Sequence, residues 1–219
     1  AAAHVVNLPG FARDIALRCR LALARRRRGV HEADAMRARV FPSDIDRNGH
    51  MNNARYFAAT NFARRRFWEL NGVWRACRER GANLIVSAQS VRYRRELQCW
   101  ASYGVVTRLV HADDNEKSFF VEHRFVRDGF ICAVQLVKYR VVPMRGRGGG
   151  GGGGGGDAAT TPSALLLAVA NSPDETNFID DVAAAAPPDV AAWIEHNARS
   201  SAALRPATSP APHSRGNTS

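Results

Sequence analysis

Asp46, Asn48 and His50 stand at alternate positions of one short polar segment. A carboxylate can act as a nucleophile or a general base, and an imidazole, whose pKa lies near neutrality, can pass a proton at physiological pH. The spacing predicts a loop that carries this chemistry. The alternative is that Asp44 and Asp46, beside Asn48-Gly49, only form a turn. We expect replacement of Asp44 to leave such a site intact.

A long helix is predicted directly after this loop. Either Asn52 or Asn53 can cap it, because a short amide side chain accepts from the free N–H groups of a first turn. Those N–H groups and the helix dipole can stabilise a negative charge that develops nearby. The pair Asn71-Gly72 ends the helix. Residues three and four apart predict its buried face: Tyr56, Ala59, Ala63, Phe67 and Leu70.

Extended segments surround this helix in the sequence. A short one, Ala38–Phe41, precedes the loop, and the pair Asp128-Gly129 marks a hairpin between the last two that follow. An order of strand, long helix and four-stranded antiparallel meander predicts an α+β fold. The four later strands, rich in Val, Phe, Ile and Tyr, are Asn83–Tyr93, Trp100–His111, Ser118–Val126 and Phe130–Val142.

The run from Ser43 to Tyr56, together with Val91-Arg92-Tyr93-Arg94-Arg95, resembles a known signature. It is similar to that of the hotdog-fold thioesterase superfamily, which includes the 4-hydroxybenzoyl-CoA thioesterase-like and plant acyl-carrier-protein thioesterase families. Within it, the thioesterase superfamily member 6-like proteins are the most similar. The resemblance covers about residues 30–143 and 187–205. It implies a hotdog fold, in which a sheet of about five antiparallel strands wraps around one long helix.

The resemblance also implies roles for individual residues. Asp46 corresponds to the carboxylate that attacks the thioester or activates water, and Asn48 and His50 match the other catalytic groups of the plant enzymes. Those enzymes add a carboxylate downstream, and the corresponding stretch 81–95 contains none. Five further residues are expected to bind substrate: Asn52, Asn53, Tyr56, Arg94 and Arg95. The two arginines would bind the phosphates of coenzyme A. The alternative is that they only face solvent.

The function that follows is hydrolysis of acyl-CoA or another acyl thioester to a carboxylic acid and a free thiol, by a homodimer. Coenzyme A enters only as part of the substrate, and no separate cofactor is expected. The four cysteines are widely spaced without a C-x-x-C pair, so no metal site is predicted. The missing second carboxylate keeps an alternative open: a non-catalytic acyl-CoA-binding or lipid-binding protein of the same fold, tethered to a membrane.

The composition divides the chain into five parts. Residues 1–35 form a basic amphipathic leader, either a surface helix or a segment that contacts a membrane surface. The hotdog domain spans 36–143, a Gly/Ala-rich disordered linker 144–186, an amphipathic helix 187–205 that folds back on the core, and a disordered tail 206–219.

The net charge of +11 is no evidence for nucleic-acid binding, because its arginines do not alternate with aromatic residues and they gather in the leader. No run is long and apolar enough to span a bilayer. The predicted location is the cytoplasm, either in solution or at a membrane surface, and the start at Ala1 without methionine leaves room for an upstream anchor.

Overall fold

The computed structural model describes residues 28–144 and 157–204. The predicted tail 206–219, the glycine tract and most of the predicted leader lie outside these residues. The described part contains one five-stranded antiparallel sheet in the order β1-β3-β4-β5-β2. Its strands are β1 (Asp34–Arg39), β2 (Ala82–Tyr93), β3 (Ser102–Asp113), β4 (Ser118–Arg127) and β5 (Phe130–Pro143).

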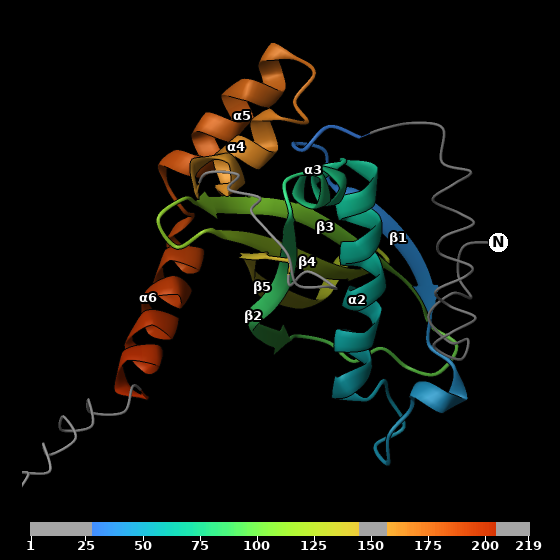
Figure 1. Cartoon of the computed structure of the whole chain (residues 1–219). Helices are drawn as coiled ribbons and strands as arrows, with labels where there is room; N and C mark the ends of the chain where they lie inside the picture. Colours follow the sequence, from blue (N-terminus) through green and yellow to red (C-terminus); the bar gives the residue numbers. More distant parts are fainter. Residues whose placement is uncertain (1–27, 145–156, 205–219) are drawn as a thin grey trace, which may run out of the picture. The chain divides into compact units, whose positions relative to one another are not determined.

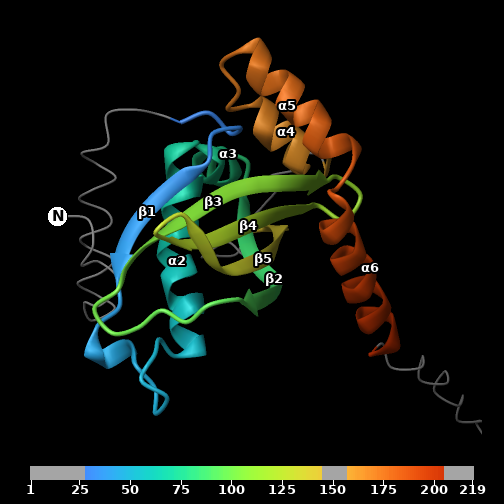
Figure 2. The ribbon, with the colours of Figure 1, turned by 180° about the vertical axis from the view of Figure 1, so that it is seen from behind.

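The helix α2 (Asn53–Leu70) lies across one face of this sheet. It stands in front of the strands in Figure 1 and behind them in the reverse view of Figure 2. All five residues predicted for its buried face are buried, none more than 8% exposed. A curved antiparallel sheet around one long central helix is the hotdog fold, as predicted.

Two apolar clusters fill the space between α2 and the sheet. One surrounds the N-terminal half of α2, where Tyr56 and Ala59 pack against Phe125 of β4. The other surrounds the C-terminal half, where Phe67 and Trp68 are buried. Three polar residues form a short row across the sheet: Thr107 of β3, His123 of β4 and Gln135 of β5. They are neighbours in the strand pairing, and all three are fully buried.

The first strand and the region after α2 differ in detail from the prediction. β1 begins at Asp34 and ends at Arg39, so the predicted strand 38–41 was placed too late. Its alternation of buried and exposed residues starts at Asp34, whose buried carboxylate receives two hydrogen bonds from Arg66. A short helix that was not predicted, α3 (Val73–Glu79), follows α2.

The prediction of a disordered linker over 144–186 is wrong for its second part. Residues 157–160 form a short 3-10 helix, η3 (Asp157–Thr160), followed by α4 (Pro162–Leu167) and α5 (Pro173–Ala184). Leu165, Leu166 and Ile179 are buried in the same cluster as Phe67 and Trp68. These helices are ordered because they complete the core at that end of the sheet.

The described residues 188–204 belong to a separate compact unit. Its described part is one helix, α6 (Pro188–Ala203), which occupies the range predicted for the C-terminal amphipathic helix. The side-chain amide of Asn197 donates to the carbonyl of Trp193 over 2.7 Å within this helix. Its folding back on the core stays a prediction.

Candidate active site

The polar loop before α2 is held in a small antiparallel ladder. Isolated bridges pair Ile45 with Met51 and His50 with Gln98, and the N–H of Met51 donates to the carbonyl of Leu97 over 2.8 Å. Ile45 is partly buried against the apolar cluster, and Met51 and Leu97 are fully buried in it. Because successive residues of extended chain point to opposite sides, His50 and Gln98 lie on the face turned away from the core.

Asp46 joins His50 on that outer face. The N–H of Asp46 donates to the carbonyl of His50 over 3.1 Å, and Gly49, at φ 79°, closes the turn by donating to the carbonyl of Asp46. The Asp46 carboxylate accepts from the N–H of Asn48 over 2.8 Å and lies 3.9 Å from Nδ1 of His50. The turn thus holds a carboxylate beside the imidazole.

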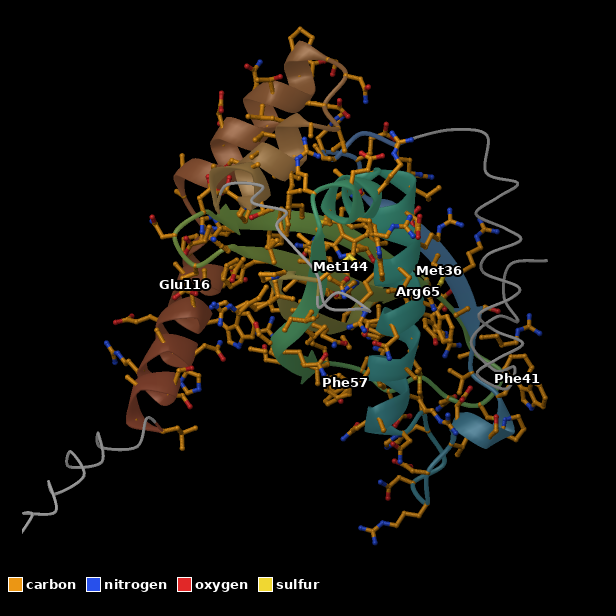
Figure 3. All side chains as sticks on the ribbon, in the orientation of Figure 1. Met36, Phe41, Phe57, Arg65, Glu116 and Met144 are labelled. Atoms are coloured by element: carbon orange, nitrogen blue, oxygen red, sulfur yellow. The ribbon has the colours of Figure 1, made fainter. Side chains whose placement is uncertain are left out.

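The start of α2 lies next to this loop. The side chain of Asn52 accepts from the N–H of Ala54 over 2.9 Å, so Asn52 is the helix cap. The N–H of Asn52 donates to the carbonyl of Asp44 over 2.8 Å, which ties the cap to the loop. Figure 3 shows Phe57 near this end of α2, whereas Glu116, in the β3–β4 turn, lies well away from it.

A cavity of about 280 Å³ opens at the same place. It brings together five of the residues predicted from the sequence, His50, Asn53, Tyr56, Arg94 and Arg95, and its other lining residues are Met51, Tyr93 and Glu96. The remaining predicted residues do not line it: Asp46 stands beside His50, Asn48 is exposed in the turn, and Asn52 caps the helix.

Tyr56 is the most buried polar residue of the cavity wall. Its ring centroid lies 5.0 Å from that of Tyr93 and 4.8 Å from that of Phe125. Burial is the main cause that raises the pKa of Tyr56 far above its ordinary value, with the charges of Cys132, Tyr93 and Glu96 adding to it. Tyr56 therefore stays neutral in the physiological range and gives the cavity an aromatic wall.

Arg94 and Arg95 form a basic rim. The backbone N–H groups of both arginines donate to the carbonyl of Cys132, over 2.8 and 3.0 Å, and these bonds fix the turn after β2. Their guanidinium groups lie over the ring of Phe130, and Cζ of Arg95 is 3.8 Å from the ring centroid. A second cavity of about 270 Å³ adjoins the first and is lined by Arg95, Glu96, Gln98, Arg127, Asp128 and Cys132.

Asp44 is part of the framework, contrary to its interpretation as a dispensable turn residue. Its side chain is buried, accepts from the N–H of Phe41 over 3.0 Å and lies 3.4 Å from the guanidinium of Arg55. Removing one partner of a buried charged pair is costly. Replacement of Asp44 is therefore expected to damage the loop.

Sequence reasoning missed Glu96. The stretch 81–95 contains no carboxylate, and Glu96, the next residue, lines both cavities. The available signal was its position three residues after the predicted strand 83–93, whose end carries the arginines already assigned to the site.

Residues 40–194 match the family model described as the thioesterase-like superfamily. This chain belongs to the thioesterase-like superfamily. It is 37% identical to the Xenopus laevis protein THEM6 over 105 residues, which are 47% of this chain and 50% of that protein. It is 40% identical to THEM6 of Danio rerio over 117 residues, 52% of this chain and 57% of that one. The chain thus spans about half the length of the curated relatives it matches.

Solved structures of similar proteins include a gentisyl-coenzyme A thioesterase, at 19% identity and a TM-score of 0.47, covering 63% of this chain and 100% of that one. Another is YbaW, a probable thioesterase from Escherichia coli, at 19% identity and a TM-score of 0.45, covering 51% and 84%. Within residues 28–144 and 157–204, no helix combines the length and apolar character needed to cross a membrane. The same residues contain no cluster of three or more side chains suited to hold a metal ion.

Proposed function

We propose that this protein hydrolyses acyl-CoA thioesters to a carboxylic acid and free coenzyme A. The observation that carries the proposal is the cavity at the start of α2, which joins His50, Asn53 and Tyr56 to the basic rim of Arg94 and Arg95. Membership in the thioesterase-like superfamily supports the same reaction class.

The geometry favours different roles for His50 and Asp46. His50 lines the cavity and can exchange a proton with the reacting groups. Asp46, 3.9 Å from Nδ1 of His50, is placed to orient the imidazole. The N–H groups and the dipole at the start of α2 would stabilise the oxyanion that develops on the thioester carbonyl.

The basic rim fits the carrier half of the substrate. Arginine guanidinium groups bind phosphate through paired hydrogen bonds, and coenzyme A carries phosphates at the end remote from its thiol. Arg94 and Arg95 line the same cavity as His50. We infer that they bind the carrier part of an acyl-CoA whose thioester lies near His50.

A binding function without turnover is the second candidate. It is favoured by the Asp46 carboxylate, which is already used by the N–H of Asn48 and does not line the cavity. In this reading the cavity holds an acyl-CoA or a lipid, and the protein contacts a membrane through residues 1–35, which lie mostly outside the described residues.

The test is a panel of acyl-CoAs with a free-thiol readout, applied to the wild type and to Asp46→Asn. Loss of this carboxylate is expected to lower kcat by about 10²–10⁴-fold, because His50 loses both its orientation and its charge partner. Asp180→Asn, an exposed residue of α5, makes the same chemical change away from the cavity and should leave the rate unchanged. Tight binding of an acyl-CoA by an inactive wild type would instead support the binding function.

A further inference from the structure

Glu96 shares one face of the small ladder with His50. His50 is directly opposite Gln98 in an antiparallel bridge, and Met51 is hydrogen-bonded to Leu97. Met51 and Leu97 point into the core, where they are 2% and 0% exposed. The side chain of Glu96 is hydrogen-bonded to that of Gln98, so Glu96 lies on the side of Gln98 and His50.

Glu96 is the single carboxylate among the residues that line the first cavity. Its side chain is exposed, and its Oε1 accepts from Nε2 of Gln98 over 3.1 Å, so a neighbour on the same face orients it. Its negative charge reaches the cavity wall, because it is one of the smaller causes that raise the pKa of Tyr56. Asp46 does not line this cavity.

Glu96 and His50 line the same cavity. A water and a thioester carbonyl bound there meet a carboxylate and an imidazole, the two kinds of group that acid–base hydrolysis needs.

The geometry points to Glu96 as the general base of this site, with His50 as the general acid; this rests on the proposed function. Glu96 takes one proton from water as the water oxygen forms a bond to the thioester carbonyl carbon. The C–S bond then breaks, and protonated His50 gives its proton to the departing thiolate. The products are the carboxylic acid and the free thiol, and the proton held by Glu96 passes to solvent or back to His50.

The test compares Glu96→Gln with the wild type on the most rapidly hydrolysed acyl-CoA. The variant keeps size and hydrogen bonding but cannot take a proton, so kcat should fall by about 10²–10⁴-fold with KM little changed. Glu96→Asp, which retains a carboxylate, should recover part of the activity.

Two controls separate this role from a structural one. Glu69→Gln makes the same change at an exposed position near the end of α2 and should leave kcat unchanged. A non-hydrolysable thioether analogue of the acyl-CoA should bind Glu96→Gln as tightly as the wild type. Full activity of Glu96→Gln with an active wild type would overturn the role of Glu96 alone. An inactive wild type would overturn the proposed function and the role of Glu96 together.

Discussion

His123 is a fully buried histidine at the centre of the polar row under α2. Its Nδ1 lies 2.9 Å from the hydroxyl of Thr107, and its Nε2 has no hydrogen-bond partner among the described residues. Burial, with the positive charge of Arg64 adding to it, lowers the pKa of His123 to about 3. In the folded protein this imidazole is therefore neutral at neutral and mildly acidic pH.

The shift predicts a loss of stability in mild acid. The unfolded chain binds a proton at His123 below about pH 6.5, whereas the folded chain does not until about pH 3, so acid favours unfolding across that window. Between about pH 7.5 and about pH 5 the wild type should lose about 2 kcal/mol more than His123→Gln, which cannot titrate there. Urea unfolding of both proteins at both pH values measures the difference. Equal losses in the two proteins would contradict it.

Individual site residues were predictable to the extent that local sequence places them. His50, Asn53 and Tyr56 follow one another around the start of α2, so the motif spacing already brings them together. Glu96 reaches the cavity through the pairing of residues 97–98 with residues 50–51. Such a contact between distant segments leaves no periodic trace in the sequence.

Helix α4 packs into the core, although the composition of its segment predicted disorder. Leu166 is 0% exposed in the cluster around Trp68, whereas the next residue, Leu167, is 50% exposed. Leu166→Ala should lower the free energy of unfolding by about 2–5 kcal/mol, because it leaves a void in packed core. Leu167→Ala removes the same atoms from the surface and should have little effect. Chemical denaturation of the two variants decides whether α4 is part of the folded core.

The sequence carried signals for these helices that the surrounding glycine, alanine and proline obscured. Thr161 and Ser172 each precede a proline and cap the helix that follows, and their side chains accept from the N–H groups of Ala164 and Glu175. This is the pattern expected at a helix start. By contrast, α2 and strands β2–β5 were predicted to within two residues at each end, because the hydrophobic period of a long run indicates whether it is a helix or a strand.

Strand β2 is one of the two edge strands of the described sheet, the other being β1. Within the described sheet β2 is hydrogen-bonded to β5 alone, and Ile85 of β2 is 44% exposed. An open edge with apolar side chains favours pairing with a second copy. Light scattering should therefore give about twice the 23.9 kDa of one chain.

A charge placed on this edge should weaken the dimer. Ile85→Lys brings like charges together where two copies of β2 meet, and the scattering mass should fall toward that of the monomer. Leu167→Lys introduces the same charge at an equally exposed leucine of α4 and should leave the mass unchanged. A wild type that remains monomeric at high micromolar concentration would contradict the prediction.

The participation of α5 in the core has a consequence for how the chain is made. The sheet is complete when Pro143 has been synthesised, but Ile179 and Val182 must follow before the cluster that contains Val30 and Trp68 is covered. About 40 residues separate the end of β5 from the end of α5, which at about 5–20 residues per second is a delay of about 2–8 seconds. During that interval the nascent chain presents an uncovered apolar end, the kind of surface that chaperones at the ribosome bind.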